Sequence, residues 1–186
     1  EDTELVAAFE AIKEATGAVS LTYFEVATLA ALWIFRERDV DVQVLEVGLG
    51  GRLDAVNIVD ADLSVVTSIG LDHTDWLGDS RELIAIEKAG VARAGQPCVV
   101  ADSDPPGSLL STLDALGART CLINREWSVV GGEMKTESDQ RYQLPSNTGL
   151  LPVNMGAAIQ ALELSGLVTV DQSLIDHLAS VSLTGR

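Results

Sequence analysis

Glu46 is the first residue whose type and position indicate chemistry. It continues the alternating valines at positions 40, 42 and 44, so we expect it in a covered parallel strand, where an unpaired carboxylate is costly. Its cation is then either Arg52, further along the chain, or a metal ion bound at the strand end. The sequence leaves both alternatives open.

His73 follows a second apolar run, residues 63–69, and lies within the stretch Leu-Asp-His-Thr-Asp-Trp-Leu-Gly at 71–78. One imidazole and two carboxylates there would lie at the same sheet edge as Glu46 and would provide hard ligands for a metal ion. The alternative is an ordinary surface histidine. The other histidine, His177, is expected to be solvated or to lie at a helix end.

Lys88 lies four residues after Ile84, on or near the inward stripe of a predicted helix. An amine held there is partly desolvated, which lowers the pKa of a lysine and leaves free base for carbamylation or Schiff-base formation. The alternative, favoured by composition alone, is a snorkelling lysine that pairs with Glu87 or another neighbour.

Two further segments are candidates for ligand contact. Residues 48–55, Gly-Leu-Gly-Gly-Arg-Leu-Asp-Ala, lack the G-x-G-x-x-G spacing of dinucleotide loops. They form either a tight turn or a loop whose backbone amides approach a ligand, with Arg52 and Asp54 as polar contacts. Tyr23 and Phe24 open a predicted helix, where they either pack in the core or flank a flat aromatic ligand.

These candidates are positioned by alternating helices and strands. Helices are predicted from about residue 5 to Gly17, from the capping box of Thr22 and Glu25 to about 38, and over 80–93, 108–116, 152–165 and 172–181. Strands are predicted over 40–47, 63–69, 98–101 and 120–123, with a hairpin or excursion in 127–149. This alternation indicates a three-layer α/β fold, a mostly parallel sheet flanked by helices, whose ligands bind beyond the carboxyl ends of the strands.

Charge and composition exclude several classes of function. The 186 residues include 28 Asp and Glu but 12 Lys and Arg, a net charge of −16 that repels nucleic-acid backbones and anionic lipid headgroups. No apolar stretch reaches the roughly 18 residues of a membrane span. The acidic start without Met indicates neither a signal peptide nor a natural start, so we expect a piece of a longer chain. Cys98 and Cys121 lie in apolar runs, as reduced buried thiols do in a cytosol-like compartment.

Several motifs together resemble one family. They are LTYFE at 21–25, LEVGLGGRLDAVNIVDADLSVVTSIGLDHTDWLG at 45–78, EKAG at 87–90, N-x-x-A-A at 154–158 and LTGR at 183–186. By these motifs the chain resembles the dihydrofolate synthase/folylpolyglutamate synthase family of the Mur ligase superfamily along nearly its whole length. The resemblance implies that residues 1–186 are a single domain, part of the family's central, P-loop NTPase-like ATP-binding domain.

The resemblance also implies a role for each candidate residue. Glu46 and His73 would be magnesium ligands, and Lys88 would carry a carbamate near the metal ions. The pterin substrate would be bound by Thr22, Tyr23, Phe24 and Glu25 together with Leu53, Asp54 and Ala55. Asn154 and Arg186 would contact ATP.

The activity that the resemblance implies is ATP- and Mg²⁺-dependent ligation of L-glutamate to dihydropteroate and to folates through an acyl phosphate, by a monomeric, cytoplasmic parent enzyme. The family's T-N-G-K-G-S phosphate loop and its glutamate-binding C-terminal domain lie outside this sequence, so we expect residues 1–186 alone to be inactive. Two positions depart from the family: Thr184 stands where Pro is usual, and Gly156 where Ala is usual. A fragment of a nicotinamide-dependent oxidoreductase and a non-catalytic interaction domain are the alternative functions.

Overall fold

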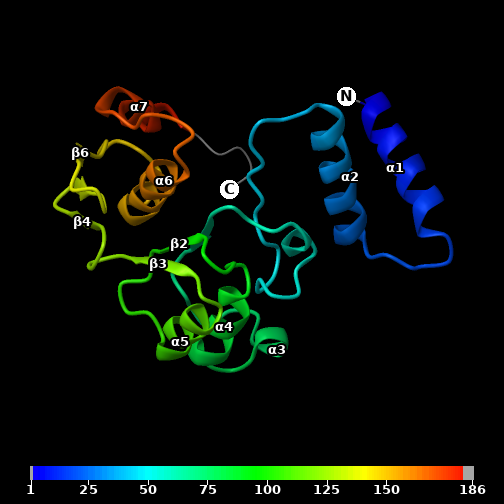
Figure 1. Cartoon of the computed structure of the whole chain (residues 1–186), viewed down its shortest axis with the longest axis horizontal. Helices are drawn as coiled ribbons and strands as arrows, with labels where there is room; N and C mark the ends of the chain where they lie inside the picture. The colour runs from blue at the N-terminus through cyan, green and yellow to red at the C-terminus, as the bar shows by residue number, and fades with distance from the viewer. Residues whose placement is uncertain (1, 182–186) are drawn as a thin grey trace. The chain divides into compact units, whose positions relative to one another are not determined.

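The computed structural model describes residues 2–181, which form two compact units (Figure 1). The helical unit contains residues 2–49 and 53–59, and the sheet unit contains residues 50–52 and 60–181. The single domain expected over residues 1–186 stays a prediction. No helix in the described part of the chain has the length and apolar character needed to cross a bilayer.

The helical unit is built on two helices, α1 (Asp2–Thr16) and α2 (Tyr23–Glu37), followed by the short 3₁₀-helix η1 (Ala55–Ile58). The predicted capping box is confirmed: the Thr22 hydroxyl accepts from the Glu25 amide at 3.2 Å, and the Glu25 carboxylate accepts from the Thr22 amide at 2.6 Å. At the other end of α2, the Arg38 guanidinium donates to both carboxylate oxygens of Glu4, at 2.9 and 2.7 Å, which links α2 to α1.

The strand predicted over residues 40–47 is wrong. These residues form irregular chain, and the side chain of Val44 is 90% exposed. Alternating valines form a strand only where a neighbouring strand pairs with their backbone, and the six strands of residues 2–181 pair among themselves. Glu46 therefore lies exposed on irregular chain, not in a covered strand.

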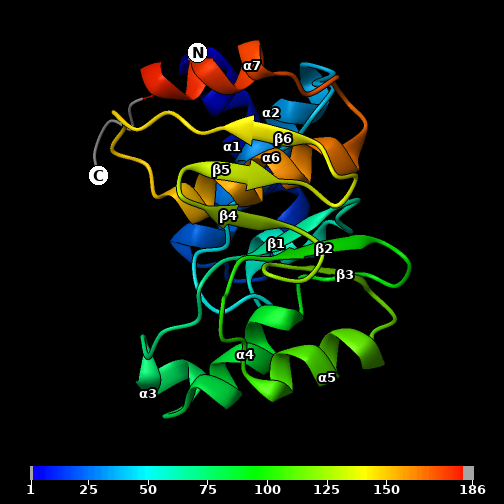
Figure 2. The same cartoon turned by 90° about the vertical axis from the view of Figure 1, so that its left-hand side faces the viewer.

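The sheet unit has the predicted three-layer α/β architecture. Its parallel sheet has the order β1-β2-β3, formed by Ser64–Val66, Pro97–Val100 and Arg119–Leu122. Figure 2 shows α4 (Arg81–Ala89) and α5 (Gly107–Ala115) on one face of this sheet and α6 (Pro152–Ser165) on the other. Side chains alternate between the faces: Cys98 and Val100 pack with the residues of α4 and α5, and Val99 packs with those of α6.

Several element boundaries differ from their predictions because local hydrogen bonds replace the regular ladder. Strand β1 ends at Val66, and the Ile69 amide donates to the Asp102 carboxylate at 2.8 Å. Helix α4 ends at Ala89, since the amides of residues 90–92 bond three residues back in a tightened last turn. The last predicted helix is α-helical only as α7 (Gln172–Asp176) and continues as the 3₁₀-helix η2 (His177–Ser180).

The segment predicted as a hairpin or excursion is a small antiparallel sheet. Its strands are β4 (Ser128–Val130), β5 (Glu133–Lys135) and β6 (Arg141–Gln143), paired in that order. Met134 of β5 is fully buried in the same cluster as Met155 of α6. The small sheet therefore extends the core on the α6 side of the parallel sheet.

Cys98 and Cys121 are both buried, as predicted, and both are free thiols, not joined in a disulfide. Val99, the neighbour of Cys98, pairs in register with Cys121, so the two thiols point to opposite faces of the sheet. Burial, reinforced by the nearby Glu137 carboxylate, raises the pKa of the Cys121 thiol to about 12, and burial also raises the pKa of Cys98.

We therefore predict that neither thiol of the native chain reacts with a disulfide reagent such as DTNB at pH 8, because both are protonated and shielded. After unfolding in urea, both thiols react. The absorbance of the released thiolate, followed with and without urea, measures this difference. Rapid reaction of either thiol in the native chain would contradict the packing described here.

Residues 50–52 lie close to the end of α4, and glycines at positions 51 and 90 make this approach possible. The Arg52 amide donates to the Glu87 carbonyl at 2.8 Å. A Cβ at Gly51 would lie 2.7 Å from that carbonyl oxygen, and a Cβ at Gly90 would overlap with the Cβ of Arg52. Any larger residue at either position would force the two segments apart.

We predict that Gly90→Ala lowers the free energy of unfolding by about 1–3 kcal/mol, because the added methyl group overlaps with backbone-proximal atoms of Arg52. Urea denaturation followed by circular dichroism measures the change. Gly107→Ala is the matched control, since a Cβ there meets no atom within 4 Å, and its effect is expected to stay within about 0.5 kcal/mol. Equal stability of the two variants would count against the close contact.

Candidate functional site

The two segments predicted to bind a pterin come together within the helical unit. Gly48 lies against the ring of Phe24, so that a Cβ at position 48 would be 2.8 Å from the Phe24 Cζ atom. The same Cβ would be 3.3 Å from the Asp54 carboxylate. Because Gly48 has no side chain, the ring of Phe24 and the carboxylate of Asp54 can both lie close to its backbone.

Asp54 organises this place through its carboxylate. One oxygen, Oδ2, accepts from the amides of Gly48 at 3.0 Å and Leu49 at 2.9 Å. The other oxygen, Oδ1, accepts from the Val56 amide at 3.0 Å and caps η1. A single side chain thereby fixes the loop before it and the turn after it.

The surface around Asp54 is apolar and open. Tyr23 is 90% exposed and Leu53 is 78% exposed, while Phe24 is partly covered. Core packing, the alternative for the two aromatic residues, is therefore wrong for Tyr23. The Glu25 carboxylate is held by Thr22, whose backbone amide and hydroxyl keep the pKa of Glu25 below its usual value.

His73 lies on an exposed loop of the sheet unit, immediately before the short helix α3 (Thr74–Leu77). Its backbone is left-handed, with φ of 51°, an unusual conformation for a residue with a side chain. The His73 amide donates to Asp72 Oδ1 at 2.8 Å, and its ring Nε2 lies 3.7 Å from Asp72 Oδ2. A carboxylate beside the ring is the usual means of orienting a ligating imidazole.

Lys88 occupies the last turn of α4 and is half-buried. The alternative in which it pairs with Glu87 is not observed, because Glu87 pairs with Arg52 at 2.9 Å. Within residues 2–181 no carboxylate forms an ion pair with the Lys88 amine. Gly51 packs beside it, since a Cβ there would lie 3.2 Å from the Lys88 Cα.

The three predicted metal ligands are divided between the units: Glu46 belongs to the helical unit, and His73 and Lys88 belong to the sheet unit. In the part of the chain that is described, no three His, Cys, Asp or Glu side chains gather in a way that would hold a metal ion. This statement concerns unmodified side chains, so it does not bear on a metal site that a carbamylated lysine completes. The ligand set therefore stays a prediction.

The two residues predicted to contact ATP have different outcomes. Asn154 is exposed in the first turn of α6, which begins at Pro152 and presents unpaired backbone amides at that end. An exposed amide side chain at a helix N-terminus suits contact with an anionic nucleotide. Arg186 lies outside the described residues.

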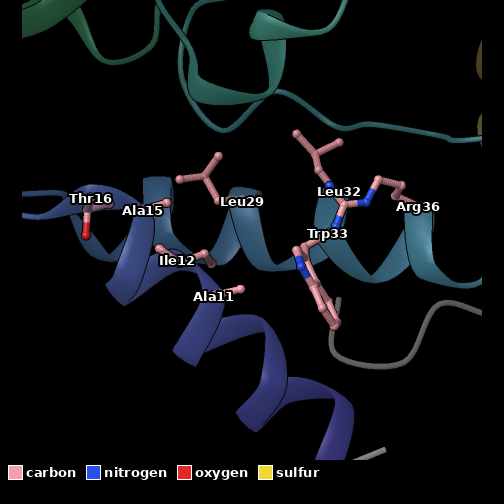
Figure 3. A pocket seen from close by; sticks show the side chains of 8 residues that line it. All are labelled: Ala11, Ile12, Ala15, Thr16, Leu29, Leu32, Trp33 and Arg36. Carbon is pink, nitrogen blue, oxygen red and sulfur yellow. The ribbon is translucent and has the colours of Figure 1, made fainter.

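A cavity of about 540 Å³ lies between α1 and α2 (Figure 3). It is lined by Ala11, Ile12, Ala15, Thr16, Leu29, Leu32, Trp33 and Arg36. None of these is a predicted site residue, and the apolar character of six of the eight fits helix packing. The Arg36 guanidinium lies 6.0 Å from the centre of the Trp33 ring at the edge of this cavity.

Sequence reasoning missed one polar network at the carboxyl ends of β1 and β2. Asp102 lies two residues after the end of β2 and is buried, and its carboxylate pairs with Arg81 at 3.0 Å. The available signal was its position, because a carboxylate just after a buried strand lies where ligands of α/β sheets bind.

Comparison with known proteins extends this description. No family model matches the sequence. Dihydrofolate synthase/folylpolyglutamate synthase of Escherichia coli (strain K12) is 44% identical over 183 residues, which are 97% of this chain and 43% of that protein. The enzyme of the same name from Haemophilus influenzae is 40% identical over 173 residues, 90% of this chain and 39% of that protein.

Solved structures of enzymes with the same names are also similar to this chain. E. coli FolC in complex with DHPP and ADP is 43% identical, has a TM-score of 0.93, and is covered to 46% by the whole of this chain. Bifunctional folylpolyglutamate synthase/dihydrofolate synthase of Yersinia pestis, complexed with AMPPNP and a Mn ion, is 40% identical with a TM-score of 0.88, again with 46% of that chain covered. The α/β fold described above is thus the fold of these folate ligases.

Over nearly its whole length the chain is similar to enzymes of the dihydrofolate synthase/folylpolyglutamate synthase family. It spans less than half the length of the curated relatives it matches, 43% and 39% for the two named above.

We predict that Asp54→Ala destabilises the chain by about 1–3 kcal/mol, because three backbone amides lose their acceptor. Hydrogen exchange should accelerate at the amides of Gly48, Leu49 and Val56, as measured by NMR or mass spectrometry. Asp60→Ala is the control: Asp60 is exposed and pairs only at the surface with Arg93, so its loss should cost less than about 1 kcal/mol. Unchanged exchange at Gly48 and Leu49 would contradict the role given to Asp54.

Proposed function

We propose that the whole protein carrying this sequence ligates L-glutamate to dihydropteroate and to glutamylated folates, using ATP and magnesium ions. The carboxylate of the pterin substrate attacks the γ-phosphate of ATP, which gives an acyl phosphate and releases ADP. The amino group of L-glutamate then displaces phosphate and forms the amide. Identity of 44% to the E. coli ligase along nearly all of this chain supports the proposal.

The observation that carries the proposal is the meeting of Phe24 and Asp54 around Gly48. An exposed aromatic ring beside a carboxylate suits a flat heterocycle with N–H donors, since the ring stacks on its face and the carboxylate accepts at its edge. Tyr23 and Leu53 extend the exposed apolar surface. E. coli FolC, which is 43% identical, is solved in complex with DHPP and ADP, and this supports a pterin ligand for the present chain.

Glu46, His73 and carbamylated Lys88 are the residues that would hold the magnesium ions. By chemistry they fit such a site: two provide anionic oxygen donors, and the third provides an imidazole with the Asp72 carboxylate beside it. Lys88, which has no carboxylate partner among residues 2–181, is accessible to carbamylation in a way that a paired lysine is not. When bound, the ions would neutralise charge between ATP and the substrate carboxylate.

The nucleotide would be contacted by Asn154 at the start of α6 and by Arg186. A relative solved with Mn, AMPPNP and L-glutamate, 41% identical with a TM-score of 0.87, supports this nucleotide and amino-acid pairing. We also propose a cytoplasmic location and a monomeric state. The two reduced thiols support the location, because disulfides are rare in the cytosol.

We predict that His73→Ala in the whole protein lowers turnover by about 100-fold or more at millimolar magnesium, because loss of a direct ligand costs at least as much as loss of the groups that orient it. The measurement is glutamate-dependent phosphate release with ATP and dihydropteroate.

The second histidine provides the control. His177 is exposed, and its ring bonds to the Ser173 carbonyl of the preceding turn, so His177→Ala should retain wild-type turnover. Full activity of His73→Ala would overturn its role as a ligand. Absence of glutamate-dependent phosphate release from the unmutated protein would overturn the proposed function itself, and tight saturable binding of NADH would favour an oxidoreductase instead.

A further inference from the structure

The strongest polar feature outside the predicted site is the ion pair between Arg81 and Asp102. Asp102 is 5% exposed and accepts three hydrogen bonds. Its Oδ2 accepts from the Ile69 amide at 2.8 Å and from Arg81 Nη2 at 3.0 Å, and its Oδ1 accepts from the Asp104 amide at 2.9 Å. The buried carboxylate is thus satisfied by one cation and two backbone amides.

Arg81, the first residue of α4, extends the same network. Its Nε donates to the Ile69 carbonyl at 2.8 Å, and its Nη2 donates to the Asp104 carbonyl at 2.8 Å. Its Nη1 lies 3.4 Å from the Asp104 carboxylate. The planar guanidinium therefore joins the chain after β1, the chain after β2 and the N-terminus of α4, a task that a lysine amine cannot perform from one position.

This network holds both ends of the loop that carries His73. Ile69 lies three residues after the end of β1, and Arg81 begins α4 at the other end of the loop. These two residues share the partner Asp102. Residues 71–76 between them are exposed. His73 keeps its left-handed backbone in this loop, and such a conformation persists only where the surrounding structure holds it.

Asp102 is buried, whereas the Arg81 side chain is 38% exposed. Burial of the carboxylate costs desolvation, which offsets much of the attraction between the two charges, so the pair contributes little net stability. Its benefit is geometric, since each hydrogen bond fixes a direction. Here the fixed atoms are the Ile69 amide and carbonyl, where the His73 loop begins.

We propose that Arg81 and Asp102 are positioning residues that set the place of His73 at the carboxyl edge of the sheet and thereby tune divalent-metal binding, without touching the metal themselves. This inference rests on the proposed function, because it takes His73 to be a metal ligand.

The test is Mn²⁺ binding to the whole protein, followed by electron paramagnetic resonance, for Asp102→Asn and Arg81→Lys. Asn retains an acceptor for backbone amides but loses the charge, and Lys retains the charge but loses the forked contacts. We expect each variant to bind Mn²⁺ about 10-fold more weakly. We also expect a higher magnesium concentration for half-maximal activity, nearly unchanged kcat at saturating magnesium, and faster hydrogen exchange in residues 70–76.

Three comparisons make the result decisive. A partly unfolded variant would also bind Mn²⁺ more weakly, because only its folded fraction is competent to bind. Circular dichroism and urea denaturation of each variant without metal therefore come first, and weaker Mn²⁺ binding by a variant that is fully folded separates positioning from loss of folding. Arg119→Lys is the matched control, because Arg119 pairs with Glu137 at the surface of the same unit, at 2.7 Å, and should leave the affinity unchanged.

His73→Ala is the third comparison. If it weakens Mn²⁺ binding while Asp102→Asn and Arg81→Lys do not, the positioning role is overturned and the proposed function stands. If His73→Ala leaves Mn²⁺ binding unchanged, the ligand role of His73 and the positioning role both fail, whereas glutamate-dependent phosphate release by the unmutated protein still tests the proposed function.

Discussion

Carboxylates that accept backbone amides are the constraint on which both candidate regions depend. A loop has no ladder partner for its amides, and each unsatisfied buried amide is costly, so a side chain must accept in place of a strand. Asp54 does this for Gly48, Leu49 and Val56 in the helical unit. Asp102 does it in the sheet unit for the residues that follow β1 and β2. In each unit one carboxylate determines the shape of a loop that carries candidate ligand residues.

The same demand for partners accounts for the distribution of positive charge. Every arginine within residues 2–181 forms an ion pair with a carboxylate. The structural pairs therefore occupy cations that are already scarce in a chain of net charge −16. A protein with this balance that brings together two anionic substrates needs added cations, and this is why the proposed ligase chemistry requires magnesium.

Local patterns predicted helices well and strands less well, for a physical reason. The capping box of Thr22 and Glu25 is complete within four residues, so sequence alone specifies the start of α2. The valines before Glu46 have an equally regular pattern, yet a strand forms only when a distant segment pairs with it. The Arg81–Asp102 pair escaped prediction for the same reason, because its partners lie 12 to 33 residues apart in the chain. The meeting of Phe24 with Asp54 likewise depends on Gly48 between them in space, and no periodicity indicates it.

The motif Glu-Lys-Ala-Gly at 87–90 illustrates how packing and chemistry divide among adjacent residues. Glu87 binds Arg52 through its carboxylate and its carbonyl. Ala89 is fully buried in the core, and Gly90 admits the close approach of Arg52. Three of the four residues thus have structural reasons for their identity. Within the described residues, the amine of Lys88 forms no ion pair with a carboxylate. The carbamate proposed for Lys88 would give this half-buried amine a role that the packing of its neighbours does not.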